Sequence, residues 1–547
     1  RAQPAAYSLA SPPRLRTLMG LWNGYFIAKL GLFYADYIDL NVLFNLALAF
    51  AVILPLRSKM WRTLRLLVAI PAATALLYYD TRLPPFSRLL AQQQHLEQFS
   101  LSYVTELLGR FINPSVVLYG LGLFFIAYIF ARKLRLTTFV LLAIWPAIPL
   151  YNMWQNQQTI VRTHQNSAVV AARAEQTSIA PAGATGEPKD ADIDAALTRF
   201  YAEQAKRQVS FARPQATPAF DVLIVQICSL AWDDLLMTEQ AQAPLLQRMD
   251  ILLKRFNTAT SYSGPAAIRL LRSACGQTSH KSLYEPAAAN CYLFNQFEQA
   301  GFHKQMLLNH DGVYGNMLHE IQQYGGLNVA PDANSPASTA WLGFDGSAIK
   351  DDYEVLNGWL TRHPHDANSP IALYYNTTSL HDGNHPPGTS TSQGSASQYG
   401  TRVKRLLSDL DRLVTTLETQ QRPTMLVFIP EHGAGSRGDR MQIPFMRENP
   451  SPAITLVPAA VRFVGLPKQS NPITIDQPTS YIDLAGLMRD AIAQDPYRNN
   501  SVTAATLAAG ITSTPYVSSN EAVTVVRYSD DYYLHYQGGA WANYRYQ

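Results

Sequence analysis

Two predicted strands lead into side chains that bind metal ions. The apolar run 222–227 ends at Cys228, and the apolar run 425–429 is followed, after one proline, by Glu431 and His432. Thiolate, carboxylate and imidazole groups bind zinc in proteins, and a fourth position left open takes a nucleophile or a substrate. Each signal is weak alone, because a strand-end cysteine is more often a buried small apolar residue and a Glu-His pair usually lies on the surface. Their combination predicts a zinc site.

A serine at a predicted helix start adds a nucleophile. Residues 260–265 read Thr-Ser-Tyr-Ser-Gly-Pro and precede a helical run over 266–272. Proline is favoured in the first turn of a helix, and the free N–H groups of that turn form an anion site. Ser263 stands at this start. A serine oxygen ionised on zinc is a strong nucleophile at neutral pH, because the cation stabilises its charge.

The elements that must position these residues alternate between strands and helices from residue 218 onward. The strand-like runs are 222–227, 371–375 and 425–429, and the helix-like runs are 398–418 and 482–493. This alternation predicts an α/β domain over 218–547, with a central sheet sandwiched by helices. Functional sites in such sheets gather at the carboxyl ends of the strands. The C-terminal stretch 522–545 predicts a hairpin.

The residues before this domain, 154–217, are rich in Gln, Ala, Thr and Ser. They contain a stretch rich in helix and strand breakers, 180–188, and a run with helical spacing, 192–207. We expect a linker that carries one helix.

The first 153 residues predict a membrane domain. Of the 547 residues, 47% are apolar and only 15% are charged, against roughly 25% charged in ordinary soluble proteins. Residues 1–153 carry a net charge of +9 and the remainder one of −5, which favours a membrane-facing half and disfavours nucleic-acid binding. Five apolar segments predict five transmembrane helices, over 18–35, 42–56, 64–79, 114–131 and 137–153.

The charges between these segments indicate an orientation. Basic clusters separate the second segment from the third and the fourth from the fifth, which predicts a cytoplasmic N-terminus and an outside location for the residues after 153. The second and third segments are short, so buried soluble helices are the alternative. Asn23 and Lys29 lie inside the first segment and Asn45 lies inside the second, where polar side chains are costly and often functional. For Lys29 the alternative is that its side chain snorkels to the nearby interface. Residues 81–113 predict either an amphipathic surface helix or a plain loop helix.

The three cysteines allow three pairings. The predicted topology places all of them outside the cytoplasm, where disulfides form. Cys275 and Cys291 are close in sequence and flank a polar loop, which favours a disulfide that contributes roughly 3 kcal/mol of stability. Cys228 is then an odd thiol, either reactive or a metal ligand, and its strand-end position favours the ligand.

In their order along the chain, these patterns resemble the alkaline-phosphatase superfamily and, within it, the membrane phosphoethanolamine transferases. The matching residues are Cys228, Tyr262 and Ser263 before Gly-Pro, His381 after the strand-like run 371–376, and Glu431 and His432 before a glycine. Members that act on lipid A usually have glutamate at the first ligand, threonine as nucleophile and Asp-His-Gly at the last pair. The cysteine, serine and Glu-His-Gly found here resemble the members that modify cellulose in enterobacterial biofilms. The resemblance covers essentially the whole chain.

The resemblance implies a fold, a cofactor and a location. The fold is a five-helix transmembrane domain followed by a periplasmic α/β alkaline-phosphatase-like domain with a central mixed sheet. The cofactor is Zn²⁺, although relatives often bind a second metal, and its ligands are Cys228, Ser263, Glu431 and His432. Functional roles fall to Tyr262, His381 and Arg447, and a disulfide joins Cys275 and Cys291. The location is the bacterial inner membrane, in association with the cellulose synthase complex.

The implied reaction transfers phosphoethanolamine from phosphatidylethanolamine to the C6 hydroxyl of glucose units in nascent cellulose. Zinc-activated Ser263 attacks the phosphorus and forms a covalent intermediate. His381 protonates the departing diacylglycerol oxygen and then deprotonates the acceptor. Arg447 holds the phosphate, and Tyr262 stacks on a sugar or orients the nucleophile. Two alternatives stay open: Arg447 in a surface ion pair, and His385 in the role of His381.

Two other classes of function stay open. One is a related enzyme with another donor or acceptor: a lipid A transferase, a glycerol-phosphate polymerase or a sulfatase-type hydrolase. Ser263 lacks the Cys/Ser-x-Pro-x-Arg context of sulfatases, and Cys228 in place of glutamate disfavours the lipid A branch. The other is a non-catalytic scaffold subunit of a polysaccharide synthase, against which the full set of candidate ligands argues.

Overall fold

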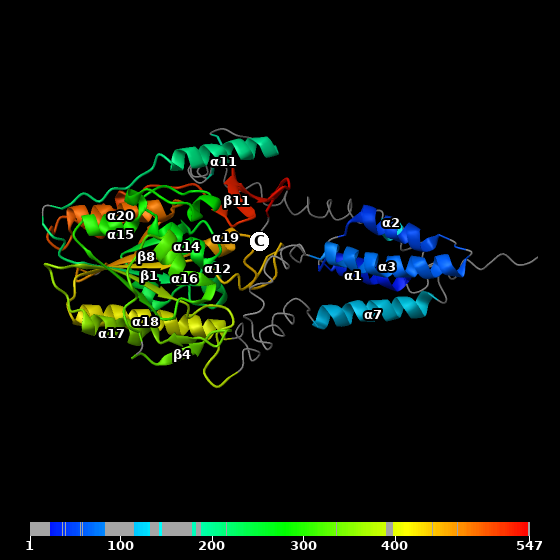
Figure 1. The fold of residues 1–547 in the computed structure, drawn as a ribbon, viewed down its shortest axis with the longest axis horizontal. Helices are drawn as coiled ribbons and strands as arrows, with labels where there is room; N and C mark the ends of the chain where they lie inside the picture. Colours follow the sequence, from blue (N-terminus) through cyan, green and yellow to red (C-terminus); the bar gives the residue numbers. More distant parts are fainter. Residues whose placement is uncertain are drawn as a thin grey trace, which may run out of the picture. The chain divides into compact units, whose positions relative to one another are not determined.

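In a computed structural model, the chain forms two compact units (Figure 1). The first unit comprises residues 1–97 and 107–165, and the second comprises residues 98–106 and 166–547. Each unit has its own hydrophobic core. The structure describes residues 22–35, 37–38, 40–54, 56, 58–81, 114–131, 142–144, 178–181, 188–214, 216–334, 336–389, 398–439, 441–467 and 469–544.

Apolar helices form the first unit. They are α1 (Trp22–Tyr34), α2 (Val42–Ile53), α3 (Lys59–Asp80) and α7 (Pro114–Ala131), and they match the first four predicted apolar segments. Among the described residues, one helix is long and apolar enough to cross a membrane, Met60–Asp80, and two apolar helices are shorter, Val42–Ile53 and Val117–Ile126. The count of five spans is therefore not confirmed. Most of the fifth predicted segment, and residues 82–113, lie outside the described residues.

Lys29 is a buried, paired cation within this unit. Its Nζ donates to Asp80 Oδ2 at 2.5 Å and to Asn45 Oδ1 at 2.8 Å, and Asn45 Nδ2 donates to the same Asp80 oxygen at 2.7 Å. The Lys29 side chain is only 2% exposed, so it does not snorkel to an interface. One side chain each from α1, α2 and α3 thus form a single polar cluster, and polar groups in apolar surroundings are stable only when they are paired in this way.

The core of the second unit is a mixed seven-stranded sheet in the order β3-β6-β1-β7-β8-β2-β9. Strands β3, β6, β1 and β7 run parallel, β8 is antiparallel to both β7 and β2, and β9 is parallel to β2. The bounds are β3 (His303–Leu308), β6 (Ile371–Thr377), β1 (Asp221–Ile227), β7 (Thr424–Pro430), β8 (Leu456–Val464), β2 (Ile251–Asn257) and β9 (Ile473–Ile475). The three predicted strands are the neighbours β6, β1 and β7. Every residue in them is buried, which explains their continuous apolar runs.

Helices cover both faces of this sheet (Figure 1). On one face lie α14 (Ser263–Leu271), α15 (Leu293–Gln299) and α20 (Tyr481–Gln494), and on the other lie α17 (Asp352–Arg362) and α18 (Tyr399–Thr419). Along β1, Val222 and Ile224 belong to the first layer while Leu223 and Val225 belong to the second, as the pleat of a strand requires. The sandwiched sheet is confirmed, and α18 and α20 confirm the two predicted helices.

A smaller antiparallel sheet holds the end of the chain. Its strands are β10 (Val517–Ser519), β11 (Val523–Tyr528), β12 (Asp531–Tyr536) and β13 (Trp541–Asn543), and β11 with β12 confirms the predicted hairpin. The helix expected in the linker is α11 (Asp190–Gln204), and its Ile193 and Phe200 pack on Val526 and Tyr528 of this sheet.

Short elements complete the second unit. The helices are α12 (Trp232–Met237), α13 (Pro244–Gln247), α16 (Met317–His319), α19 (Pro452–Thr455) and α21 (Ala504–Ala509), and the strands are β4 (Thr339–Leu342) and β5 (Ala348–Lys350). Among the described residues of this unit, three single turns are 3₁₀-helical, Lys281–Tyr284, Ala289–Cys291 and Tyr314–Asn316, and one segment is π-helical, Glu320–Tyr324.

Candidate functional site

The three predicted metal ligands lie together because the strands before them are in register. Ile227, the last residue of β1, pairs with Pro430, the last residue of β7. Cys228 and Glu431 therefore follow at the same level of the sheet, and His432 comes next in the chain. All three side chains are fully buried, and their ligand atoms lie within 4.8 Å of one another.

Ser263 joins this cluster from the start of α14. Its Oγ lies 3.5 Å from Cys228 Sγ and 3.2 Å from His432 Nε2. The first N–H groups of a helix have no partner within the helix, and for this reason they bind anions. The fold therefore brings a hydroxyl, three metal-binding side chains and an anion-binding helix start to one place.

The geometry of the four side chains fits a metal ion. Tetrahedral zinc with bonds of about 2.0–2.3 Å keeps its ligand atoms roughly 3.3–3.8 Å apart. The Ser263 oxygen lies 3.2 and 3.5 Å from two of the other donors, and Glu431 Oε2 lies 3.9 Å from His432 Nε2. This glutamate oxygen is buried and has no hydrogen-bond partner among the described residues. Such an oxygen is costly to bury, and a bound cation would supply its partner.

Burial opposes the charged forms of these ligands. It raises the pKa of the Cys228 thiol to about 11, and the neighbouring Glu431 acts in the same direction. Burial also raises the pKa of Glu431 and lowers that of His432 well below its usual value. A divalent cation has the opposite effect on a thiol, because it stabilises the thiolate, and it binds the neutral form of imidazole. The cluster is thus suited to a cation at neutral pH.

Arg447 and Tyr262 lie beside the cluster. Arg447 Nη1 is 3.2 Å from each ring nitrogen of His432 and 3.3 Å from Ser229 Oγ. Burial lowers the pKa of Arg447, but nearby acidic groups outweigh this effect and raise it overall. Tyr262 immediately precedes α14, and its hydroxyl donates to Glu448 Oε2 at 3.0 Å. A guanidinium that remains charged therefore lies next to the candidate metal ligands.

His381 lies among aromatic rings. Its ring centroid is 5.5 Å from that of Phe344 and 5.6 Å from that of Tyr314. His381 Nδ1 donates to the carbonyl of Asp382 at 2.7 Å, which leaves Nε2 unprotonated in the neutral ring. Burial lowers the pKa of His381 to about 4, and the charge of Arg447 acts in the same direction. The ring is therefore neutral at pH 7, and Nε2 is its unprotonated nitrogen.

His385, the alternative to His381, lies four residues further along the same loop. Its Nδ1 donates to the carbonyl of Gly383 at 3.2 Å, and its backbone pairs with that of Leu342. The charge of Arg447, which contacts the ring of His432, lowers the pKa of His381.

Two residues that the sequence patterns did not single out support the site. Asn376 Nδ2, on β6, donates to Glu431 Oε1 at 2.6 Å. Asp234 is fully buried and accepts from the N–H groups of Ala231 and Ala434 at 2.9 and 2.8 Å, which ties together the loops that follow β1 and β7. Asn376 stands at the end of a predicted strand and could have been found by the same rule as Cys228, whereas no sequence pattern marked Asp234.

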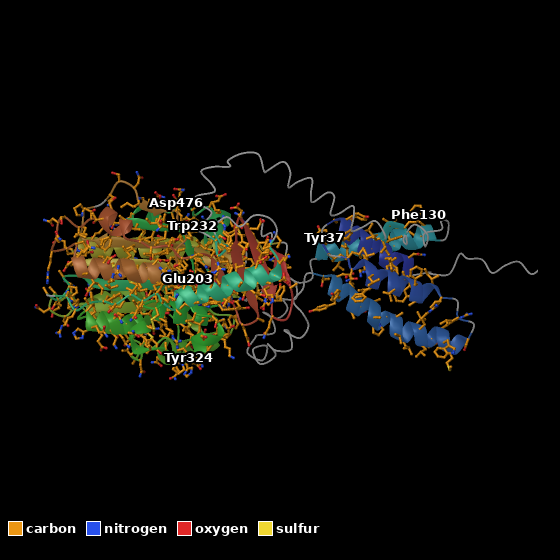
Figure 2. The ribbon with its side chains drawn as sticks, turned by 90° about the horizontal axis from the view of Figure 1, so that it is seen from above. Tyr37, Phe130, Glu203, Trp232, Tyr324 and Asp476 are labelled. Carbon is orange, nitrogen blue, oxygen red and sulfur yellow. A yellow bond between two sulfur atoms is a disulfide. The ribbon has the colours of Figure 1, made fainter. Side chains whose placement is uncertain are left out.

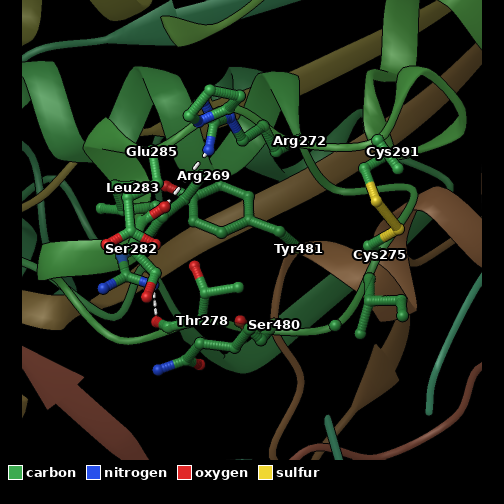
Figure 3. Close-up of a pocket in the computed structure, with 16 residues that line it drawn as sticks. Arg269, Arg272, Cys275, Thr278, Ser282, Leu283, Glu285, Cys291, Ser480 and Tyr481 are labelled. Atoms are coloured by element: carbon green, nitrogen blue, oxygen red, sulfur yellow. Dashed lines mark hydrogen bonds between the residues drawn. A yellow bond between two sulfur atoms is a disulfide. The ribbon is translucent and has the colours of Figure 1, made fainter. Parts of the chain in front are cut away.

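The predicted disulfide between Cys275 and Cys291 is present, and it borders a separate cavity (Figure 3). This cavity of about 240 Å³ is also lined by Arg269, Arg272 and Tyr481. Its lining includes none of the candidate metal ligands, so it lies apart from the cluster around Ser263.

The fold and the site define an α/β protein with a candidate metal centre beside a serine at a helix start. The chain belongs to the family of the cellulose biosynthesis protein BcsG: the N-terminal domain of that family matches residues 22–147 and the C-terminal domain matches residues 177–541. Over 541 residues, it is 38% identical to the cellulose biosynthesis protein BcsG of Salmonella typhimurium and 37% identical to that of Escherichia coli K12. Each alignment covers 96% of both chains.

Solved structures of low sequence identity are also similar. A protein in the alkaline phosphatase superfamily from Vibrio parahaemolyticus is 13% identical, with a TM-score of 0.46, over 68% of this chain and 90% of that one. The integral membrane lipooligosaccharide phosphoethanolamine transferase A of Neisseria meningitidis is 11% identical, with a TM-score of 0.37, over 86% and 95%. The assignment to the family rests on the sequence matches alone.

Proposed function

We propose that the protein transfers phosphoethanolamine from phosphatidylethanolamine to the C6 hydroxyl of glucose units in nascent cellulose, through a covalent intermediate on Ser263. The observation that carries this proposal is the position of Ser263 Oγ, 3.5 Å from Cys228 Sγ and 3.2 Å from His432 Nε2, at a helix start. The names of the BcsG relatives support cellulose biosynthesis as the setting.

In this proposal the four side chains that converge hold Zn²⁺. Thiolate, imidazole and carboxylate together suit zinc better than hard cations such as Mg²⁺ or Ca²⁺, which take oxygen ligands. When bound, the ion stabilises the ionised serine oxygen and the charge that develops on the phosphoryl group. The proposed ligands are Cys228, Ser263, Glu431 and His432.

The residues of the chain carry out the remaining steps. Ser263 Oγ attacks the phosphorus, and the bond between phosphorus and the diacylglycerol oxygen breaks. The proton that Ser263 releases reaches this leaving oxygen through His381 Nε2, which is unprotonated before the reaction. In the second step His381 takes the proton of the cellulose hydroxyl, that hydroxyl attacks the phosphorus, and Ser263 leaves and regains a proton.

Two positive features face the transferred phosphoryl group. The N–H groups at the start of α14 and the guanidinium of Arg447 stabilise its oxygens. The helix α14 begins at Ser263, and Arg447 contacts the His432 nitrogen that lies 3.2 Å from Ser263 Oγ. Tyr262 orients the nucleophile, since it is the residue before Ser263 and its hydroxyl is fixed on Glu448.

A lipid donor requires a catalyst held at the membrane. We place five spans over 1–153 with a cytoplasmic N-terminus, a linker over 154–217 and a periplasmic catalytic domain over 218–547 of an inner-membrane protein. In this arrangement the protein works beside the cellulose synthase complex, where new polymer leaves the membrane.

The test is intact-mass analysis of the full chain in lipid that contains phosphatidylethanolamine and no acceptor. One phosphoethanolamine should be added to the wild type, and none to Ser263→Ala or Cys228→Ala, because a serine without its cation is a weak nucleophile. Ser470→Ala, at an exposed serine, is the matched control and should form the adduct. An adduct on Ser263→Ala would overturn the covalent mechanism.

A further inference from the structure

The carboxylate of Glu320 lies against the helix start that carries Ser263. Glu320 begins a π-helical segment, and a Cβ atom added at Gly264 would lie only 2.3 Å from Glu320 Oε2. Gly264 follows Ser263 directly, so this carboxylate oxygen lies within about 8 Å of the Ser263 Cα atom. The absence of a side chain at Gly264 is what allows the carboxylate to approach so closely.

One oxygen of this carboxylate has no hydrogen-bond partner in the described part of the chain. Among the described residues, no ion pair involves Glu320, and its Oε2 is a buried oxygen without a hydrogen bond. A buried carboxylate oxygen is normally paired, because its desolvation is costly otherwise. Glu431 also has a buried oxygen without a hydrogen bond, but its other oxygen accepts from Asn376 and it is a candidate metal ligand. Glu320 is not among the candidate metal ligands.

A pair of tyrosine rings lies near the same place. The charge of Glu320 acts on the hydroxyl of Tyr284, and the Tyr284 ring packs edge-on against that of Tyr324 at 5.2 Å between centroids. Arg272 Nε donates to the Tyr324 carbonyl at 2.6 Å and fixes this segment. Tyr324 lies at the edge of the unit (Figure 2), and Tyr284 is 36% exposed. A carboxylate beside tyrosine rings is the chemistry that binds an organic ammonium ion.

The segment that carries Glu320 also contacts the other side of the site. Tyr314, six residues earlier, packs against the ring of His381 at 5.6 Å between centroids. One stretch of chain, 314–324, therefore reaches both His381 and the start of α14, and a group attached to the phosphorus at Ser263 would extend along it.

We propose that Glu320, flanked by Tyr284 and Tyr324, binds the ammonium group of the phosphoethanolamine while its phosphoryl group is at Ser263. Glu320 would then select the donor by the charge of its head group. This inference rests on the proposed function and adds to it the residue that determines which head group is transferred. No bond to Glu320 forms or breaks.

The experiment compares two soluble donors that differ only in the ammonium group. The full chain in lipid nanodiscs is given p-nitrophenyl phosphoethanolamine or p-nitrophenyl ethyl phosphate, and the release of p-nitrophenol is measured. Glu320→Gln should lower kcat/KM for the first donor about ten- to a hundredfold, as expected for the loss of a charged hydrogen bond, and should leave the second unchanged. The matched control is Glu203→Gln, at an exposed position on α11 (Figure 2), which should change neither.

The outcomes separate a specificity role from a structural one. An equal loss with both donors in Glu320→Gln would overturn the proposal. Glu320→Asp keeps the charge and should keep part of the preference for the ammonium donor. If Glu320→Gln does not fold, inhibition of the wild type decides: phosphoethanolamine should inhibit more strongly than ethyl phosphate, and equal inhibition would overturn the proposal. If the wild type turns over neither donor and forms no adduct on Ser263, the proposed function has failed instead.

Discussion

Ser263 Oγ lies 3.5 Å from Cys228 Sγ. The two residues are 35 positions apart, and they belong to different strand-to-helix connections of one sheet. Cys228 follows β1 and Ser263 starts α14, which comes after β2. A serine at this distance from a thiol that favours metals is in place to share one cation with it. The same contact underlies the proposed nucleophile and the proposed cofactor.

The first prediction concerns the hydroxyl of Ser263. Ser263→Ala should abolish transfer and leave the fold intact, because it removes one oxygen from a partly exposed helix start. Ser263→Thr should keep part of the activity, because the hydroxyl remains while its added methyl group must fit beside Gly264. The measurement is phosphoethanolamine incorporation into cellulose, with circular dichroism to check the fold. Undiminished transfer by Ser263→Ala would mean that the acceptor attacks the donor directly.

The second prediction concerns the metal. The purified full chain should contain about one zinc ion, as expected for a single four-coordinate site. Cys228→Ala should lose the zinc, because a methyl group cannot bind it, whereas the double variant Cys275→Ala with Cys291→Ala should keep it. Elemental analysis is the measurement. A folded wild type that takes up no zinc would contradict the ligand assignment.

The third prediction concerns Asn376, which donates to Glu431 Oε1 at 2.6 Å. Asn376→Leu removes this hydrogen bond while it leaves every candidate ligand in place. Zinc affinity should fall about ten- to a hundredfold, as is usual when a partner that orients a metal ligand is lost. Competition with a chelator measures the affinity. Asn368→Leu, at an exposed asparagine, is the control, and an equal effect there would argue against a specific role.

The fourth prediction concerns the disulfide between Cys275 and Cys291, which closes a loop with a sequence separation of 16. Its reduction should lower the stability of the second unit by roughly 3 kcal/mol, because the unfolded chain gains conformational freedom. The zinc content should not change, since Cys228 takes no part in the bond. Thermal unfolding with and without reductant tests the first statement. Mass mapping that found Cys228 in a disulfide would contradict the second.

The fifth prediction concerns pH and Asp409. Burial raises the pKa of Asp409 to about 7, and the carboxylates of Asp351 and Asp352 act in the same direction. A folded-state pKa above the unfolded one means that the folded protein binds the proton more tightly, so this group lowers stability as the pH rises from about 4 to about 7. Asp409→Asn should therefore unfold at a higher temperature than the wild type at pH 8, and the difference should shrink toward pH 4. A difference that grows as the pH falls would contradict this sign.

The elements that carry the ligands could be predicted from the amino-acid sequence. The strands that precede Cys228 and Glu431 are apolar over their whole length because they are buried on both faces. Ser263 was recognised from a local pattern, since glycine and proline after a serine mark a helix start. The closeness of Cys275 and Cys291 in the chain favoured their pairing, which the family resemblance also implied, and the disulfide is present. Each of these features depends on neighbours within a few residues, and a linear sequence displays such neighbours directly.

The contacts between residues far apart in the chain became visible only in the folded structure. Asn376 reaches Glu431 because β6, β1 and β7 are adjacent and in register, and Lys29 is paired with Asp80 across 51 positions of the chain. In the sequence, nothing distinguishes Glu320 from other glutamates of polar helices. The fold brings its carboxylate against Gly264. Long-range contacts are set by strand order, register and packing, which depend on the whole chain at once. The identity of a single charged residue, by contrast, is compatible with many positions in space.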